Sequence, residues 1–108
     1  MANFYWVGGS GNTSDATNHW ATVSGGAPNV ANVPTSADDV HWDAASNTTA
    51  YTVTVDADFT CRDLMFDAAP SVSGTITFAG SALVLCYGSV KFLSGMLVTH
   101  TGQLRFQA

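Results

Sequence analysis

The chain contains no glutamate, and Arg62, Lys91 and Arg105 are its only basic residues apart from histidine. Only 10% of its residues are charged, whereas about a quarter are charged in an average soluble domain. The missing residue types are good helix formers, while threonine, valine, serine, glycine and the aromatic residues are plentiful. The composition therefore predicts an all-β protein.

The scarcity of basic residues also limits the possible partners. Because the chain has a net charge of −5 and no basic cluster, we expect no nucleic acid partner. The longest clearly apolar run, 82–87, is far shorter than the roughly 20 residues of a membrane-spanning helix, so we expect no membrane insertion. The segment MANFYWVGGSGN lacks the positive region and apolar core of a secretory signal, which favours a protein used without the general secretion route.

Motifs that carry chemistry are missing as well. Cys61 and Cys86 are too far apart for a C-x-x-C metal or redox motif, and we expect two buried thiols or, as the alternative, a disulfide. The aspartates of segment 56–63 lack the glycine of a calcium loop. His41 and Asp43 flank a tryptophan without a placed nucleophile. The sequence predicts no catalytic residue, no metal ion and no cofactor.

A repeat occupies the C-terminal third of the chain. Residues 74–108 divide into five heptads: GTITFAG, SALVLCY, GSVKFLS, GMLVTHT and GQLRFQA. The third position is apolar in all five copies and the fifth in four. These steps of two and five differ from the three and four of a coiled coil, and a step of two places both side chains on one face of a strand. Each heptad therefore predicts one short strand and one corner.

Two architectures fit such units. The first is a short-strand β-solenoid, similar to a right-handed parallel β-helix, in which three heptads make a coil of about 21 residues. The second choice is an antiparallel meander or sandwich with glycine-led turns. In either case each unit points one pair of side chains inward. The expected pairs are Val53 and Val55, Leu64 and Phe66, Ile76 and Phe78, Leu83 and Leu85, Val90 and Phe92, Leu97 and Thr99, and Leu104 and Phe106.

The chain is expected to have two parts: a loop-rich, aromatic cap or docking segment at 1–50, and a β-repeat region at 51–108 with heptad units from residue 74. Short strands are expected at NFYWV and DVHWDA. A stacked repeat needs a cover on its open end, so the tryptophans are expected in the core of a cap or, alternatively, on a binding surface. The candidate partner contacts are Trp6, Trp20, Trp42, Asp38 and Asp39.

The motifs FYWVGGSGN, NHW, VPTSADDVHWDA and TVTVDADFTCRDLMF, followed by glycine-punctuated repeats, resemble the N-terminal region of glycine-rich β-repeat surface proteins. These are the fibre and appendage proteins of tailed-phage virions and the β-solenoid adhesins of bacteria. The resemblance spans nearly the whole chain and departs at Thr13, where such proteins usually have a second tryptophan.

The resemblance implies a structural and adhesive role without enzymatic activity. The leading expectation is a fibre, appendage or capsid-decorating component of a tailed phage, assembled in the host cytoplasm and located in the virion. Its expected partners are other virion proteins and copies of itself, with a trimer favoured, and a host-surface glycan is a further candidate. The alternative is a secreted adhesin or carbohydrate-binding module on a bacterial cell surface. Because the repeats stop after a complete heptad, we expect an oligomer or a fragment of a longer fibre.

Overall fold

The computed structural model describes residues 2–107, and within them the chain is mostly β with one short helix. Ala108, the last residue of the fifth heptad, lies outside the described residues. The elements are β1 (Asn3–Trp6), β2 (Gly11–Asn12), α1 (Ala16–His19), β3 (Trp20–Ala21), β4 (Asp39–Trp42), β5 (Tyr51–Val55), β6 (Phe59–Cys61), β7 (Leu64–Phe66), β8 (Ile76–Gly80), β9 (Val84–Cys86), β10 (Val90–Lys91), β11 (Leu97–Val98) and β12 (Leu104–Phe106).

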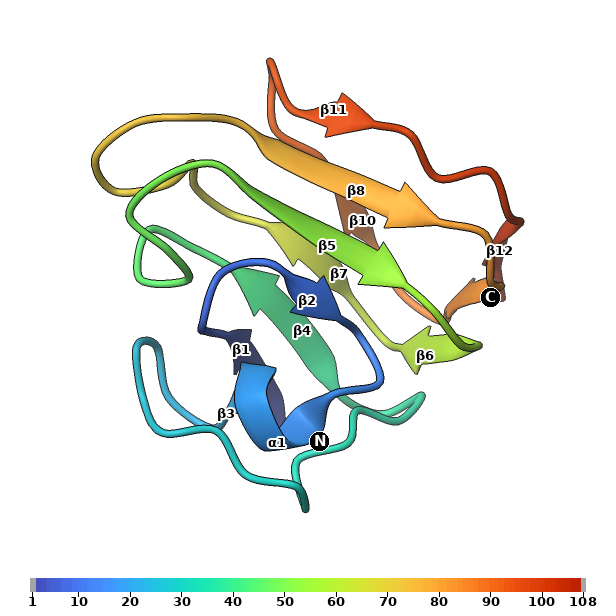
Figure 1. The fold of residues 1–108 in the computed structure, drawn as a ribbon. Coiled ribbons are helices and arrows are strands. Elements are labelled where there is room, and N and C mark those ends of the chain that lie inside the picture. Colours follow the sequence, from blue (N-terminus) through green and yellow to red (C-terminus); the bar gives the residue numbers. More distant parts are fainter. Residues whose placement is uncertain (1, 108) are drawn as a thin grey trace.

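The strands form three sheets, which we call A, B and C (Figure 1). Sheet A has the order β10-β7-β4-β1-β3, sheet B the order β11-β8-β5-β2, and sheet C the order β12-β9-β6. The chain passes through A, B and C in turn with β4 to β6, again with β7 to β9, and again with β10 to β12. Strands of successive passes pair in parallel, and only β3 is antiparallel to its neighbour. The described strands therefore do not form an antiparallel meander.

Alternation along each strand creates the core, because successive side chains of a strand point to opposite faces. Val53 and Val55 of β5 and Leu64 and Phe66 of β7 are fully buried, which confirms these predicted inward pairs. In-register pairing places like positions above one another, so Leu64 lies between Val40 and Val90 in sheet A. The core is thus a set of apolar columns that run across the sheets.

Two of the predicted inward pairs are wrong by one residue. In β9 the buried side chains are Val84 and Cys86 rather than Leu83 and Leu85. In β11, Val98 is the register partner of the buried Phe78 and therefore shares its face. The inward pair there is Met96 and Val98, with Met96 packed against the core, instead of Leu97 and Thr99.

The length of a pass also differs from the expected 21 residues. Thr77 pairs with Leu97, and Val84 pairs with Leu104, so this pass takes 20 residues. The preceding pass is longer, since Tyr51 pairs with Ile76. The corners absorb these differences, and the heptad is an approximate spacing rather than a fixed structural unit.

The first 50 residues belong to the same core as the repeats. The two strands expected there are β1 and β4, and β4 pairs with β7 of the next pass. One hydrophobic cluster extends from Phe4 to Cys86. At its N-terminal end Trp20 stacks on Phe59 of sheet C with ring centroids 5.8 Å apart. Thr13 is buried, and its carbonyl accepts a hydrogen bond from the Trp20 indole at 3.0 Å.

Candidate assembly surface

The last pass leaves one apolar pair from each sheet at the C-terminal end of the molecule. We call this surface the end face. The three strands that carry it are the last ones of their sheets; in Figure 1, β11 lies along the upper edge, β12 beside the C-terminus, and β10 behind β8. Its members are Val90 and Phe92 from sheet A, Met96 and Val98 from sheet B, and Leu104 and Phe106 from sheet C.

The side chains of the end face are more exposed than those of the pass beneath it. Phe92 is 38% exposed, Val98 49% and Phe106 60%. The residues that occupy the same columns one pass earlier, Phe66, Phe78 and Cys86, are at most 1% exposed. The side chains are still in stacking contact with the core, since the rings of Phe92 and Phe66 are 5.7 Å apart at 26°. The end face is therefore a continuation of the core that nothing covers among residues 2–107.

The backbone is open at the same place. Within the described part of the chain, β10, β11 and β12 are each the outermost strand of their sheet. An outermost strand presents unpaired N–H and C=O groups to any strand that approaches it. Free hydrogen-bonding groups and exposed apolar side chains occur together here, which is the combination that a further layer of strands would need.

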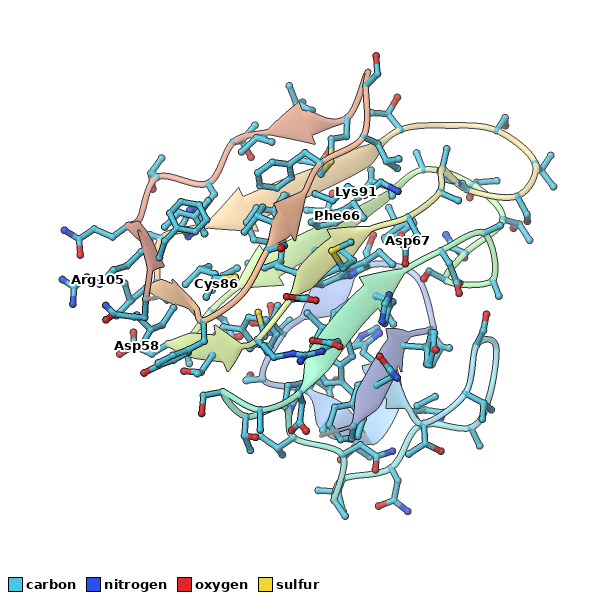
Figure 2. The ribbon with its side chains drawn as sticks, turned by 180° about the vertical axis from the view of Figure 1, so that it is seen from behind. Asp58, Phe66, Asp67, Cys86, Lys91 and Arg105 are labelled. Atoms are coloured by element: carbon cyan, nitrogen blue, oxygen red, sulfur yellow. The ribbon has the colours of Figure 1, made fainter. Side chains whose placement is uncertain are left out.

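Two basic side chains lie beside the end face and point outward. Lys91 alternates with the inward Val90 and therefore points outward, with its Nζ 3.9 Å from Asp67 Oδ1 (Figure 2). Arg105 alternates with Leu104 and Phe106 in the same way, and its Nη2 donates to Gln103 Oε1 at 3.1 Å. Figure 2 shows the Arg105 side chain directed away from the molecule. The end face thus carries no carboxylate of its own, and Lys91, near Asp67, and Arg105 lie beside it.

At the opposite end of the stack, where β3, β2 and β6 are the outermost strands of the described sheets, the apolar side chains are covered. Trp6, Trp20 and Ala21 are fully buried there. The antiparallel strand β3 occupies the far edge of sheet A. The ring of His19 stacks on Trp6 at a centroid distance of 4.3 Å and an angle of 4°, and its Nδ1 lies 2.6 Å from the carbonyl oxygen of Val7. Aromatic rings and a reversed strand cover this end of the core.

The three tryptophans named as candidate contacts lie inside the protein. Trp6, Trp20 and Trp42 are all 0% exposed, so they are not a contact surface in this structure. They form one cluster, in which Trp20 meets Trp6 and Trp42 edge to face at 5.1 and 5.4 Å. They belong to the one hydrophobic cluster that also contains the strands of the repeats, and the hydrophobic area of an indole explains why a small domain places it there.

The two candidate aspartates lie together but act within the chain. Asp38 accepts hydrogen bonds from the backbone N–H of Ala2 at 3.1 Å and of Thr35 at 2.9 Å. Asp39 is 8% exposed and accepts a bond from Arg62 Nε at 2.8 Å. Both carboxylates thus connect the beginning of β4 to other segments of the chain. Their present partners are internal.

Acid titration should reveal the contact between Arg62 and Asp39. The Arg62 guanidinium hydrogen bond holds the pKa of Asp39 below its ordinary value of 3.8. A carboxyl group with a lowered pKa in the folded state stabilises the protein above its unfolded pKa, and that contribution is lost as the pH falls below it. We expect Arg62→Gln to destabilise the chain more at pH 7 than at about pH 3, measured by urea unfolding. Equal losses at the two pH values would contradict the contact.

His41, on the outer face of sheet A, contacts side chains of neighbouring strands and loops. His41 Nδ1 contacts Asp67 Oδ2 at 2.7 Å, not Asp43, and its Nε2 lies 3.0 Å from Asn3 Oδ1. The Tyr5 ring stacks on it at 5.0 Å. Both ring nitrogens are thus in contact with neighbouring side chains of the sheet.

The cysteines and the loop aspartates also have structural positions. Cys61 and Cys86 are buried free thiols on neighbouring strands in register. Burial raises the pKa of the Cys61 thiol, which disfavours the reactive thiolate. Asp56 accepts bonds from Ser14 in a loop. Among residues 2–107, no three histidine, cysteine or carboxylate side chains come together as a metal site would require.

The residues of the end face were not singled out as contacts by the sequence. The sequence predicted that the C-terminal end would meet another chain or more of its own, but it offered no way to rank Phe92, Val98 and Phe106 above other apolar residues. The signal that identifies them is the loss of burial in the last pass, which is a property of the three-dimensional stack.

Comparisons of the chain with protein families, with curated proteins and with solved structures give no match. No helix in residues 2–107 has the length and hydrophobicity required to cross a membrane. The interpretation of function therefore depends on the geometry described above.

Proposed function

We propose that the chain is a non-enzymatic structural component of a tailed-phage particle, built as a short right-handed β-solenoid that associates with other chains through its end face. The observation that carries the proposal is the end face itself. Its three outermost strands and three half-exposed apolar side chains continue a core that is fully buried one pass earlier. Contiguous apolar surface of this kind marks interaction sites in soluble proteins.

The solenoid assignment is supported by the order of the sheets. Each of the last three passes contributes one strand to A, one to B and one to C, always in parallel. Parallel crossover connections are right-handed in nearly all proteins. Solenoid ends need a cover for their apolar interior. Here the N-terminal end has one and the C-terminal end is available to a partner.

The alternative role, a carbohydrate-binding adhesin, depended on tryptophans as platforms for sugar rings. The burial of Trp6, Trp20 and Trp42 removes these three side chains from that role in the folded chain. The structural role needs no exposed indole. Its partners are other virion proteins and copies of the same chain.

The direct test is quantitative mass spectrometry of purified particles from a phage whose genome encodes this sequence. We expect the chain to be present at a fixed copy number per particle, and to remain with the particles through density-gradient purification. Detection only in the soluble fraction of infected cells would overturn the proposal. As the control for contamination, an unrelated early protein of the phage should be absent from the same purified particles.

A further inference from the structure

We infer that Cys61 and Cys86 are a redox-sensitive pair, which closes into a disulfide between two successive passes when the chain meets an oxidising environment. They are the only cysteines of the chain, and both are free thiols in this structure. The pair lies inside the stack and is therefore separate from the end face, on which the proposed function depends. Three features of the structure support the inference: the register of the two residues, the direction of their side chains, and the hydrogen bonds around them.

The pairing of β6 with β9 brings the two cysteines next to each other. Cys61 and Cys86 are direct register partners in this parallel pair, although two other strands, β7 and β8, lie between them in the sequence. Neighbouring strands of a sheet lie about 4.8 Å apart, and the two Cα atoms of a disulfide are usually about 4.4–6.8 Å apart. The backbone therefore already has the spacing that the bond requires.

The two side chains point to the same side of sheet C. In β6 and in β9 alike, the first and third residues are buried and the middle one is half-buried. Cys61 and Cys86 are the third residues of their strands, and both are 0% exposed. Burial raises the pKa of the Cys61 thiol, and the neighbouring thiol of Cys86 raises it further. The two thiols are therefore neighbours in the core.

Oxidation of Cys86 would leave its present hydrogen-bond acceptors with other donors. Cys86 Sγ (Figure 2) lies 3.0 Å from the Arg62 carbonyl oxygen and 3.5 Å from that of Ser89. Both carbonyl oxygens also accept a backbone hydrogen bond, from Gly88 at 2.6 Å and from Leu64 at 2.8 Å respectively. A buried acceptor that loses its only donor is costly. These second donors therefore make the loss of the thiol hydrogen compatible with the fold.

The oxidant in this reaction is a small-molecule disulfide such as oxidised glutathione. One cysteine thiolate attacks a sulfur of that molecule, which forms a mixed disulfide and releases one small thiol. The second cysteine thiolate then attacks the protein sulfur of the mixed disulfide, which forms the bond between Cys61 and Cys86 and releases the other small thiol. The two protein thiols lose two protons and two electrons, and the small disulfide takes up both. Since both thiols are buried, the exchange occurs while the chain folds or when sheet C opens locally.

The bond would join β6 to β9 and close the loop 61–86. Each of these strands has only three residues, and sheet C is the smallest of the three sheets. A disulfide stabilises a fold mainly because it restricts the unfolded chain. In the proposed role the chain is made in the reducing cytoplasm and is then carried on the virion, where disulfides persist. The pair would thus hold two passes together covalently only outside the cell.

The test compares disulfide formation in the folded and in the unfolded chain. The reduced and the oxidised chain are each diluted from urea into mixtures of reduced and oxidised glutathione, and a parallel series stays in concentrated urea. After acid quenching, mass spectrometry measures the fraction with the Cys61–Cys86 bond, which is two hydrogens lighter than the reduced chain. We expect an equilibrium constant about 100-fold larger in the folded chain, and a melting temperature about 10 °C higher after oxidation. A constant no larger than in urea, or glutathione adducts in place of the bond, would overturn the inference.

A variant with the second cysteine moved by one residue is the matched control. Leu85→Cys combined with Cys86→Ala closes a loop of almost the same length in urea, but residue 85 is the register partner of Thr60 and points to the opposite face of sheet C. We expect this chain to gain nothing over urea when it folds, with the tryptophan fluorescence of the wild type retained. An equal gain would overturn the inference, since register would then play no part.

Cys86→Ala alone separates the bond from other effects of the redox buffer. This chain should melt at the same temperature in reducing and in oxidising glutathione mixtures, because it cannot form the bond. A rise equal to that of the wild type would overturn the inference. Absence of the chain from phage particles would overturn the proposed function and leave the behaviour expected of the cysteine pair unchanged.

Discussion

Trp20→Ala is expected to lower the free energy of unfolding by about 3–5 kcal/mol, the range found when a fully buried large aromatic side chain is truncated. Trp20 is 0% exposed, stacks on Phe59 and meets two further indoles edge to face. Its Nε1 donates to the Thr13 carbonyl, which the substitution would leave unpaired. The side chain is therefore expected to be the main closure of the N-terminal end.

The measurement is urea unfolding followed by circular dichroism, with Tyr87→Ala as the matched control. Tyr87 is an aromatic residue that is 43% exposed and lies outside the end face, so its truncation should cost less than about 1.5 kcal/mol. A loss at Trp20 no greater than the loss at Tyr87 would show that the indole is not part of a packed core. Binding assays that use tryptophan-to-alanine variants would report this loss of stability rather than a lost contact with a ligand.

Gly80→Ala is expected to be the second large effect. Gly80 has φ = 106° and lies opposite Val55 in the parallel pair of β8 and β5. A Cβ at this position would lie 2.6 Å from the Val55 backbone nitrogen and would also overlap its carbonyl. Left-handed backbone costs a side chain about 1–2 kcal/mol, and forced separation of packed elements adds about 1–3 kcal/mol. The two strands would have to move apart.

Gly95→Ala separates the two contributions. Gly95 also has a positive φ, of 84°, but a Cβ there would meet nothing within 4 Å. We expect Gly95→Ala to lower the free energy of unfolding by the conformational contribution alone, about 1–2 kcal/mol. Thermal unfolding of the two variants beside the wild type gives the comparison. Equal losses would mean that β8 and β5 are not held as closely as the structure has them.

The sequence predicted the elements whose patterns are unambiguous. YTVTVD alternates strictly, and Val53 and Val55 are buried as expected. The pair Leu64 and Phe66 was also assigned correctly, although the apolar Met65 lies between them. In YTVTVD only one face of the strand is apolar, so the direction of the side chains follows from the residue types.

The two assignments that failed both lie where apolar residues run together. Leu83, Val84 and Leu85 are consecutive, and so are Met96, Leu97 and Val98. Such runs contain no information on which side chain points inward, because either alternation gives an apolar face. The prediction of which side chains point inward followed the heptad spacing. In the structure, the corners have unequal lengths, and this shifts which side chains point inward. The tertiary stack, through Phe78 beneath Val98, therefore overrides the local repeat.

Only part of the candidate site could be predicted from the sequence. The lack of acidic residues after Asp67 is visible in the sequence. The identity of the exposed side chains depends on which strand is outermost in each sheet, and that order is a long-range property. For the tryptophans the ambiguity was physical, because an indole serves equally well in a core and on a binding surface.

The central claim is that buried aromatic side chains cover one end of the core and that the other end takes a partner. Hydrogen exchange followed by mass spectrometry, at low and high protein concentration, tests it most directly. The account predicts strong protection in β1 and β4 at every concentration, and protection in β10, β11 and β12 that rises with concentration in the wild type but not in Val98→Lys. Protection of β10 to β12 that does not change with concentration, or rapid exchange in β1 and β4, would contradict it.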